Sequence, residues 1–295
     1  MIARFFLALM WLLHFLPLGV LQYLGSALGS LLHCFGRERR AVCEANLARC
    51  LPSLPLPERK RLARKHFQMI GRAVLERGLL WWGSRQRIQN TIQIEGIEHL
   101  QALQGEPVIL FAPHFLALDA GYTRLSCEVD MAAIYANQKS APMNAMLLRG
   151  RTRFRHQRMF SRQQGVRAAV AALREGVPLY YLPDQDYGAR DAIFTPFFGI
   201  LAATITGLSR LAKLSGASVV PCVTTMLPGG GGYRVRCYPP WQDFPSDDLA
   251  ADARRMNAFI EARVLESPEQ YNWAHKRFKT RPPGEPPFYD EKIRR

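Results

Sequence analysis

A histidine and an aspartate stand just after a strongly apolar run. In the segment FAPHFLALDA, four residues separate His114 from Asp119. Residues 107–112 (PVILFA) predict a buried strand, so His114 would leave its carboxyl end, where open α/β sheets bind ligands. If the next helix begins in this turn, Asp119 can hold one ring nitrogen and leave the other to accept a proton. The pair predicts a general base without a serine nucleophile, although a structural histidine fits the same spacing.

A second acidic element follows the apolar residues 177–182. The segment YLPDQDYG places Asp184 and Asp186 just past this predicted strand. Because the carboxyl ends of parallel strands meet at one edge of a sheet, we expect both aspartates near His114. A turn closed by aspartate and glycine is the simpler interpretation. The Asp-x-Asp spacing also suits a metal-dependent glycosyltransferase, but that function leaves His114 unexplained and the chain carries no nucleotide signature.

A third feature is a run of arginines between the two acidic elements. The run also contains His156 and consists of Arg149, Arg151, Arg153, Arg155, Arg158 and Arg162. Guanidinium groups bind phosphate through two parallel hydrogen bonds, so the run suits a phosphorylated substrate. A solvated charged face is the alternative.

The overall composition narrows the possible partners. Of the 295 residues, 48% are hydrophobic and 21% charged, which excludes a disordered chain. The net charge of +15 favours an acidic partner: nucleic acid, an anionic membrane or an acidic protein. The six cysteines include no C-x-x-C pair and no histidine at zinc spacing, so we expect buried thiols. The motifs of serine hydrolases, zinc proteases and P-loop proteins are absent.

Short apolar strands alternate with helical segments from about residue 91. The expected strands are 91–95, 107–112, 129–135, 177–182, 217–226 and 233–238. The expected helices lie near 115–126, 141–150, 163–175, 203–214 and 248–266. This alternation predicts an α/β fold with a mostly parallel sheet flanked by helices. Pro228 and the four glycines after it predict a hairpin turn rather than a phosphate-binding loop, because no helix follows them.

The N-terminal segment is apolar. Residues 5–21 carry no charge and predict a membrane-anchoring helix, although Pro17 interrupts it. A cleaved signal peptide and a buried core helix are the alternatives. Basic residues follow this run and hardly precede it, which predicts a cytoplasmic location for the rest of the chain. We expect an anchor at 1–36, a basic helical segment at 37–90 and an α/β domain at 91–295.

The basic segment is expected to contain one long amphipathic helix at 57–82. Its first half is strongly basic, and its apolar residues recur at near-helical spacing. The helix ends in Trp81 and Trp82, which suit either a bilayer interface or the edge of a core.

Taken together, these segments resemble a known family. His-x-x-x-x-Asp at a strand end, behind an apolar N-terminus, is similar to the glycerolipid and lipid A acyltransferase superfamily. Further text resembles its late (secondary) lipid A acyltransferases, closest to the lauroyl type. That text comprises EANLARCLP (44–52), APHFLALDAG (112–121), YLPDQDYG (181–188), FTPFFGILAATITGLSRLA (194–212) and PEQYNWAHKRFKTRPPGEPPFY (268–289). The resemblance covers nearly the whole chain.

The resemblance implies a role for each candidate residue. His114 would be the general base and Asp119 would orient it, although many members carry glutamate at the latter position. The family's substrate-binding arginine falls, by spacing, at Arg151, and its aspartate falls at Asp184. The implied acyl donor is acyl carrier protein, and the acceptor is a phosphorylated, Kdo-bearing lipid A precursor at the bacterial inner membrane. Direct attack on the thioester implies no cofactor, metal or covalent enzyme intermediate.

Two other functions remain open at this point. The chain could acylate another membrane lipid, such as a lysophospholipid or an aminolipid. It could also be a basic protein without catalytic activity that binds a membrane or nucleic acid. We expect no nucleic-acid partner, because the arginines lie in an α/β pattern without a recognisable nucleic-acid module.

Overall fold

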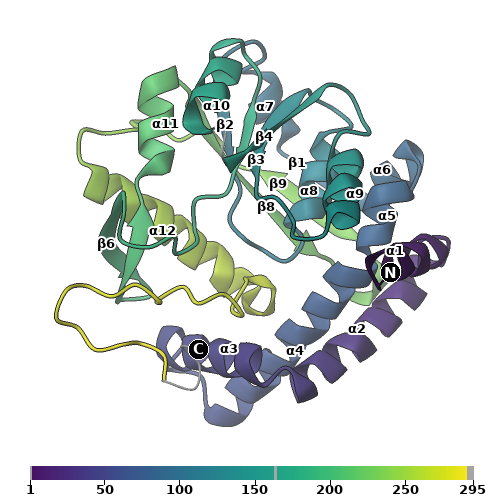
Figure 1. Cartoon of the computed structure of the whole chain (residues 1–295). Coiled ribbons are helices and arrows are strands. Elements are labelled where there is room, and N and C mark those ends of the chain that lie inside the picture. Colours follow the sequence, from purple (N-terminus) through teal and green to yellow (C-terminus); the bar gives the residue numbers. More distant parts are fainter. Residues whose placement is uncertain (1, 163–164, 291–295) are drawn as a thin grey trace.

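A seven-stranded sheet forms the centre of the computed structural model, which describes residues 2–162 and 165–290 (Figure 1). Its strands, in chain order, are β1 (Ile92–Glu95), β2 (Val108–Phe111), β3 (Met131–Tyr135), β4 (Gln157–Ser161), β5 (Leu179–Tyr181), β8 (Ser218–Met226) and β9 (Tyr233–Cys237). They lie in the order β1-β9-β8-β2-β5-β3-β4, and only β8 and β9 pair in antiparallel fashion. The expected mostly parallel sheet is confirmed, as is the glycine-rich hairpin turn at 228–232.

Both faces of the sheet are covered, as the alternation along β2 shows. Ile109 and Phe111 point into one apolar cluster, whereas Val108 and Leu110 belong to the other. The first cluster is covered by α10 (Gly165–Arg174), α11 (Gly207–Ser215) and α12 (Leu249–Glu266). The second is covered by α5 (Arg77–Trp82), α6 (Arg85–Thr91), α7 (Ile97–Gln101) and α8 (Leu118–Leu125). All four β2 side chains are therefore buried, which explains why this strand reads as an unbroken apolar run.

Three strands were not predicted. β4 is an edge strand in the arginine run, paired only with β3, so it lacks the apolar pattern of a buried strand. β6 (Ala192–Phe197) and β7 (Ile200–Ile205) form a separate antiparallel hairpin whose turn contains Gly199 at φ +75°. The helix expected at 203–214 was therefore wrong at its start, because residues 203–205 pair with β6 and α11 begins only at Gly207. Part of the helix expected at 163–175 lies outside the described residues.

The apolar N-terminus forms two helices instead of one. These are α1 (Ile2–Leu13) and α2 (Leu18–Phe35), and they separate at Pro17, which cannot donate the backbone hydrogen bond of a continuing helix. Within the described residues, α2 alone is long and apolar enough to cross a membrane, judged by length and composition. The outer faces of this region expose large apolar side chains: Phe5, Leu9, Trp11, Leu12, Phe15, Val20, Tyr23, Leu24, Leu31, Leu32 and Phe35.

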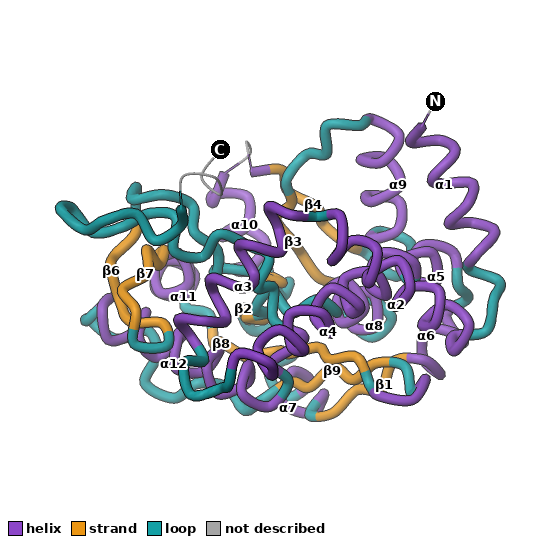
Figure 2. The backbone as a smooth tube through the Cα atoms, turned by 90° about the horizontal axis from the view of Figure 1, so that it is seen from below, coloured by secondary structure: helices purple, strands orange, loops and turns teal. Residues whose placement is uncertain are grey.

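The basic segment also divides differently from the prediction. It forms α3 (Arg37–Cys50) and α4 (Leu56–Leu75), and the expected helix 57–82 breaks at Glu76, before α5. Figure 1 shows α2, α3 and α4 together along the lower side of the molecule, and Figure 2 looks onto them from below. Five of the six cysteines are buried as expected, but Cys34 is exposed.

Glycines bring α2 and α4 into close contact. A Cβ atom placed on Gly71 would lie 2.1 Å from the carbonyl oxygen of Gly25, and one placed on Gly29 would lie 2.1 Å from that of Phe67. Both distances are shorter than any real contact, so only glycine permits this separation of the two helices. The apolar N-terminus is thus packed on the rest of the chain through backbone contacts.

We expect Gly71→Ala to destabilise the chain by about 1–3 kcal/mol, because the added methyl group has no room. The melting temperature of the detergent-solubilised protein should fall by about 3 °C or more. Gly19→Ala is the matched control, since nothing lies within 4 Å of a Cβ atom there. Equal melting temperatures for the two variants would contradict the close packing of α2 on α4.

Candidate active site

A cavity of about 540 Å³ opens at the carboxyl edge of the sheet. It lies beyond the ends of β2, β5 and β3 and is bordered by α5, α8 and α9 (Ala141–Arg151). Its polar lining includes His114, Asp119 and Arg151, so the structure places these predicted residues around one cavity. Much of the rest is apolar, including Trp81, Leu118, Ile134, Met143, Leu147, Val166 and Leu182.

The catalytic histidine expected from the sequence contacts Asp184. Nδ1 of His114 lies 2.5 Å from Oδ1 of Asp184, and the backbone N–H of His114 donates to Oδ2 at 2.9 Å. The contact follows from the sheet, because β2 and β5 are neighbouring parallel strands and each residue comes just after its strand. A carboxylate can only accept hydrogen bonds. We therefore assign the ring proton to Nδ1, which donates to Asp184. No residue in the described part of the chain hydrogen-bonds Nε2, which is left as the proton acceptor.

Asp184 is buried and ionised. Its exposed fraction is 1%. Burial alone would raise the pKa of this carboxyl, but His114 and then Arg277 outweigh burial and lower the pKa below its usual range. Arg277 is itself buried and donates to the carbonyl oxygen of Ala203 at 2.7 Å. The carboxylate is therefore an acceptor for Nδ1 and can hold the ring of His114 in one orientation.

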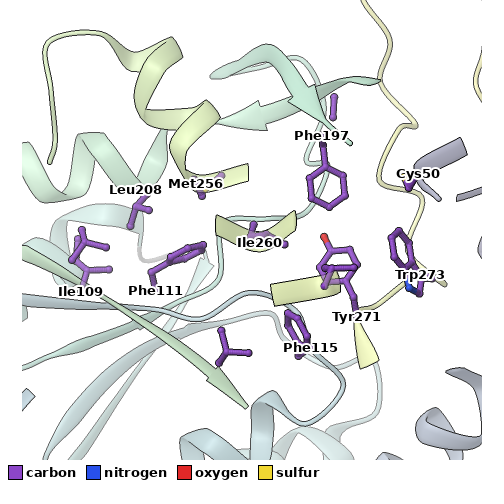
Figure 3. Packing of buried hydrophobic residues seen from close by; sticks show 14 of the residues in the cluster. Cys50, Ile109, Phe111, Phe115, Phe197, Leu208, Met256, Ile260, Tyr271 and Trp273 are labelled. Atoms are coloured by element: carbon purple, nitrogen blue, oxygen red, sulfur yellow. The ribbon is translucent and has the colours of Figure 1, made fainter. Parts of the chain in front are cut away.

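The C-terminal segment contacts the loop that carries His114. The backbone N–H of Asn272 donates to the carbonyl oxygen of His114 at 3.1 Å, and Phe115 forms a bridge with Tyr271. Figure 3 shows Phe115, Tyr271, Trp273 and Phe197 gathered in this region. The ring centroids of Tyr271 lie 5.8 Å from those of Phe115 and of Phe197. This aromatic packing holds the histidine loop in place.

Asp119 does not hydrogen-bond to His114, so the contact predicted from the sequence was wrong. Asp119 lies in the first turn of α8, where α5 and α9 each bring an arginine to it. Arg77 Nη2 lies 3.0 Å from Oδ2, and Arg151 Nη2 lies 2.7 Å from Oδ1. Both carboxylate oxygens are therefore occupied by guanidinium groups, and Nδ1 of His114 is occupied by Asp184. Asp119 still borders the same cavity as His114.

The two arginines keep Asp119 ionised. Burial alone would raise the pKa of this carboxyl, but Arg151 and then Arg77 outweigh burial and lower the pKa to about 2. The Asp119 side chain is 21% exposed and that of Arg151 is 20% exposed. With two guanidinium groups and one carboxylate, the cluster carries one net positive charge at the cavity wall.

The arginine run divides between the cavity and the rest of the surface. Arg151 and Arg162 line the cavity, and Arg162 also donates to the hydroxyl of Tyr187. Arg153 instead donates to backbone carbonyls of residues 80 and 83. The partners of Arg155 and Arg158 are the exposed carboxylates of Asp130 and Glu175. The solvated-face interpretation therefore holds for part of the run.

The sequence reasoning missed Arg77, which lines the cavity. Arg77 follows a helix break that the apolar periodicity does not reveal, so nothing in the sequence placed it at the cavity. Asp186 was predicted near the site, and it contacts the C-terminal segment. Its carboxylate accepts hydrogen bonds from the backbone N–H and the hydroxyl of Thr280, which connect this segment to the Asp184 loop.

In the described residues, no group of three or more His, Cys, Asp or Glu side chains is placed to hold a metal ion.

A comparison with known protein families shows the family of this chain. Residues 1–280 match the family described as "Bacterial lipid A biosynthesis acyltransferase". The chain belongs to this family. It is accordingly an O-acyltransferase, as the resemblance implied.

Relatives in the lipid A acyltransferase family extend over almost the whole chain. A lipid A biosynthesis lauroyltransferase of Escherichia coli (strain K12) is 34% identical over 286 residues, which cover 96% of this chain and 93% of the relative. A lipid A biosynthesis palmitoleoyltransferase of the same organism is 33% identical over 288 residues, covering 97% and 93%. A solved 1-acyl-sn-glycerophosphate acyltransferase from Thermotoga maritima matches with a TM-score of 0.41 and 14% identity, over 84% of this chain and 96% of that one.

Proposed function

We propose that this acyltransferase moves a twelve-carbon acyl chain from acyl carrier protein to a hydroxyl of a Kdo-bearing lipid A precursor. The observation that carries the proposal is His114, oriented by Asp184 at the wall of a largely apolar cavity. Membership of the lipid A acyltransferase family supports the acceptor, and the similarity to a relative named lauroyltransferase supports the chain length.

The proposed reaction is a direct attack on the thioester. Nε2 of His114 takes the proton of the acceptor hydroxyl as its oxygen bonds to the thioester carbon. The tetrahedral intermediate then collapses, the carbon–sulfur bond breaks, and the imidazolium returns the proton to the leaving thiolate. Asp184 holds the ring in the required tautomer and stabilises the imidazolium. Asp184 therefore takes the orienting role that the sequence assigned to Asp119.

We assign Arg151 to the acceptor. It lies on the cavity wall, and its pairing with Asp119 limits the conformations of the guanidinium. A phosphate or Kdo carboxylate on the acceptor is a suitable partner for the net positive charge of this cluster. The excess positive charge elsewhere on the chain suits docking of the acidic carrier protein.

The apolar part of the cavity is proposed to hold the acyl chain. Neighbouring strands are about 4.8 Å apart, so the sheet edge that borders the cavity from β2 to β3 spans roughly 10 Å. Along this distance the lining includes Ile134 from β3, Met143 and Leu147 from α9, and Leu182 after β5. A largely apolar space of limited length favours one donor length over others.

Leu147→Trp is expected to shift donor preference towards shorter chains. A larger side chain at this position removes room for about two methylene groups, each worth about 0.8 kcal/mol when buried. The preference for twelve carbons over eight should fall by roughly 15-fold, measured as a ratio of kcat/KM values for the two donors. Leu148→Trp, on the same helix but not on the cavity, is the matched control. An unchanged ratio in Leu147→Trp would place the acyl chain elsewhere.

The N-terminal helices are proposed to hold the enzyme on the inner membrane, with the catalytic part in the cytoplasm. Their exposed apolar side chains suit the lipid side of an interface, and the basic first half of α4 suits anionic headgroups. Each basic residue near an anionic surface contributes about 1 kcal/mol. The proposed membrane partners are thus both apolar and anionic lipids.

Mass spectrometry of lipid A tests the proposed function. Cells without the protein should lack one twelve-carbon chain on lipid A, and the purified protein should add it back from the acyl carrier protein thioester. Unchanged lipid A together with altered phospholipids would contradict the proposal and favour the alternative membrane-lipid acceptor.

A further inference from the structure

Arg77 shares Asp119 with Arg151, and this sharing is not explained by the proposed roles of the other site residues. The two arginines come from different helices, and each contacts a different oxygen of the carboxylate. We propose that Arg77 is a positioning residue of acyl transfer, which holds Asp119 so that Arg151 faces the acceptor. The inference rests on the proposed function of this site.

The arrangement makes Asp119 a bridge between α5 and α9. A carboxylate that pairs with Arg151 alone can follow that side chain as it moves. A carboxylate held on its other oxygen by Arg77 is fixed relative to α5, so Arg151 is fixed as well. Preorganised contacts of this kind keep a site within the narrow geometry that a reaction needs.

Contacts of the neighbouring residues hold Arg77 in position. The residue before it, Glu76, is fully buried at the break between α4 and α5. Its carboxylate accepts from Nε of Arg72 at 3.0 Å and from the hydroxyl of Tyr233 on β9. A buried charge with these partners is costly to displace, so α5 begins at a fixed point.

The residue after Arg77 is equally constrained. A Cβ atom on Gly78 would lie 2.6 Å from the carbonyl oxygen of Met10, so α1 packs directly on α5. One turn later, Trp81 is buried and lines the cavity, and its ring lies 6.0 Å from the Arg77 guanidinium. Arg77 therefore lies on a short helix with two fixed contacts. Glu76 connects its start to β9, and Gly78 packs against α1.

The electrostatics agree with a role towards an anionic substrate. Arg77 lines the cavity, and its side chain is 36% exposed. Because Arg77 shares the carboxylate of Asp119, this carboxylate does not cancel the charge of Arg151 alone, so Arg151 keeps positive charge towards the acceptor. A charge placed only to stabilise the fold has no need to border the cavity.

Steady-state kinetics of acyl transfer to the lipid A precursor test the proposal. We expect Arg77→Gln to lower kcat/KM for the acceptor by 10- to 100-fold, mostly through KM for the acceptor, with little change in KM for the donor. Arg77→Lys should recover only part of the loss, because lysine keeps the charge but lacks the planar fork. If Arg77 acts through Asp119, adding Arg77→Gln to Asp119→Asn should lower the rate by no more than about threefold beyond Asp119→Asn alone.

The matched control is Arg236→Gln on β9, a residue that does not line the cavity. There Glu95 of β1 also lies between two arginines, Arg234 at 2.8 Å and Arg236 at 2.7 Å. This variant should keep the kinetics of the unmodified protein. Melting temperatures of all variants separate loss of folding from loss of positioning, and Arg77→Lys serves if Arg77→Gln does not fold.

Three results would overturn the inference: Arg77→Gln within twofold of the unmodified protein, equal losses in Arg77→Gln and Arg236→Gln, or multiplied losses in the double variant. The rate of the unmodified protein with the twelve-carbon carrier protein donor tests the proposed function separately. The variant ratios test Arg77 with whichever acyl donor the unmodified protein uses.

Discussion

His114→Ala is expected to lower the rate of acyl transfer by at least 100-fold while the chain stays folded. A hydroxyl is a poor nucleophile near neutral pH because its proton must leave as it attacks. A positioned base contributes about 10²–10⁴-fold, and His114 is the imidazole whose Nδ1 is held while Nε2 is left to act. The histidine backbone is held independently by Asp184 and Asn272, so loss of the ring leaves the loop in place.

The assay is acyl transfer from acyl carrier protein to the lipid A precursor by purified protein, with melting temperature as the test of folding. His156→Ala is the matched control, because this imidazole is exposed and lies outside the cavity. A folded His114→Ala variant that keeps more than about a tenth of the unmodified rate would contradict general-base catalysis by His114.

The main sheet follows from apolar patterning, whereas its edge and the added hairpin do not. The strands with buried residues on both faces read as short apolar runs, and all six predicted strands are present. β4 was missed because an edge strand pairs on one side only and tolerates polar residues such as Gln157 and Arg158. β7 was missed because its residues 200–205 have small and apolar side chains that suit a helix equally well. Their pairing with β6 decides between the two, and pairing is a long-range property.

The sequence predicted residues that meet at one cavity, but it did not predict which side chains pair there. His114, Asp119 and Arg151 do line one cavity. Sequence separation made Asp119 the natural partner of His114, since only four residues lie between them. The observed partner, Asp184, is 70 residues away and becomes the neighbour only because β5 lies beside β2 in the sheet. Strand order is a tertiary property that no local spacing encodes.

Arg77 shows a second limit of sequence reasoning. A continuous amphipathic helix over 57–82 would have placed it on the periodic pattern of its neighbours. The break at Glu76 redirects α5 and brings Arg77 to the cavity. At that break Glu76 contacts Tyr233, a residue 157 positions away. Local helix propensity does not encode such a long-range contact.

Asp184→Asn is expected to lower acyl transfer by about 10²–10⁴-fold, although the change replaces only one oxygen by an amide nitrogen. The carboxylate accepts from both the backbone N–H and the ring of His114. Asparagine has one acceptor, and the backbone N–H must keep it because it can only donate. The amide NH₂ then faces Nδ1, which becomes an acceptor, and the ring proton moves to Nε2. A histidine that carries its proton on Nε2 cannot accept one there.

Nitrogen NMR of the His114 imidazole measures this change directly, alongside the rate. Asp184→Asn should move the proton from Nδ1 to Nε2, whereas Asp119→Asn should slow transfer through the arginine pair and leave the tautomer unchanged. Asp186→Asn is the matched control on the same loop: it weakens the contacts with Thr280 and should lower stability without altering the His114 tautomer. A tautomer that changes in Asp119→Asn and not in Asp184→Asn would return the orienting role to Asp119. Because the two carboxylates contact different partners, the rate and the NMR signal together assign each one.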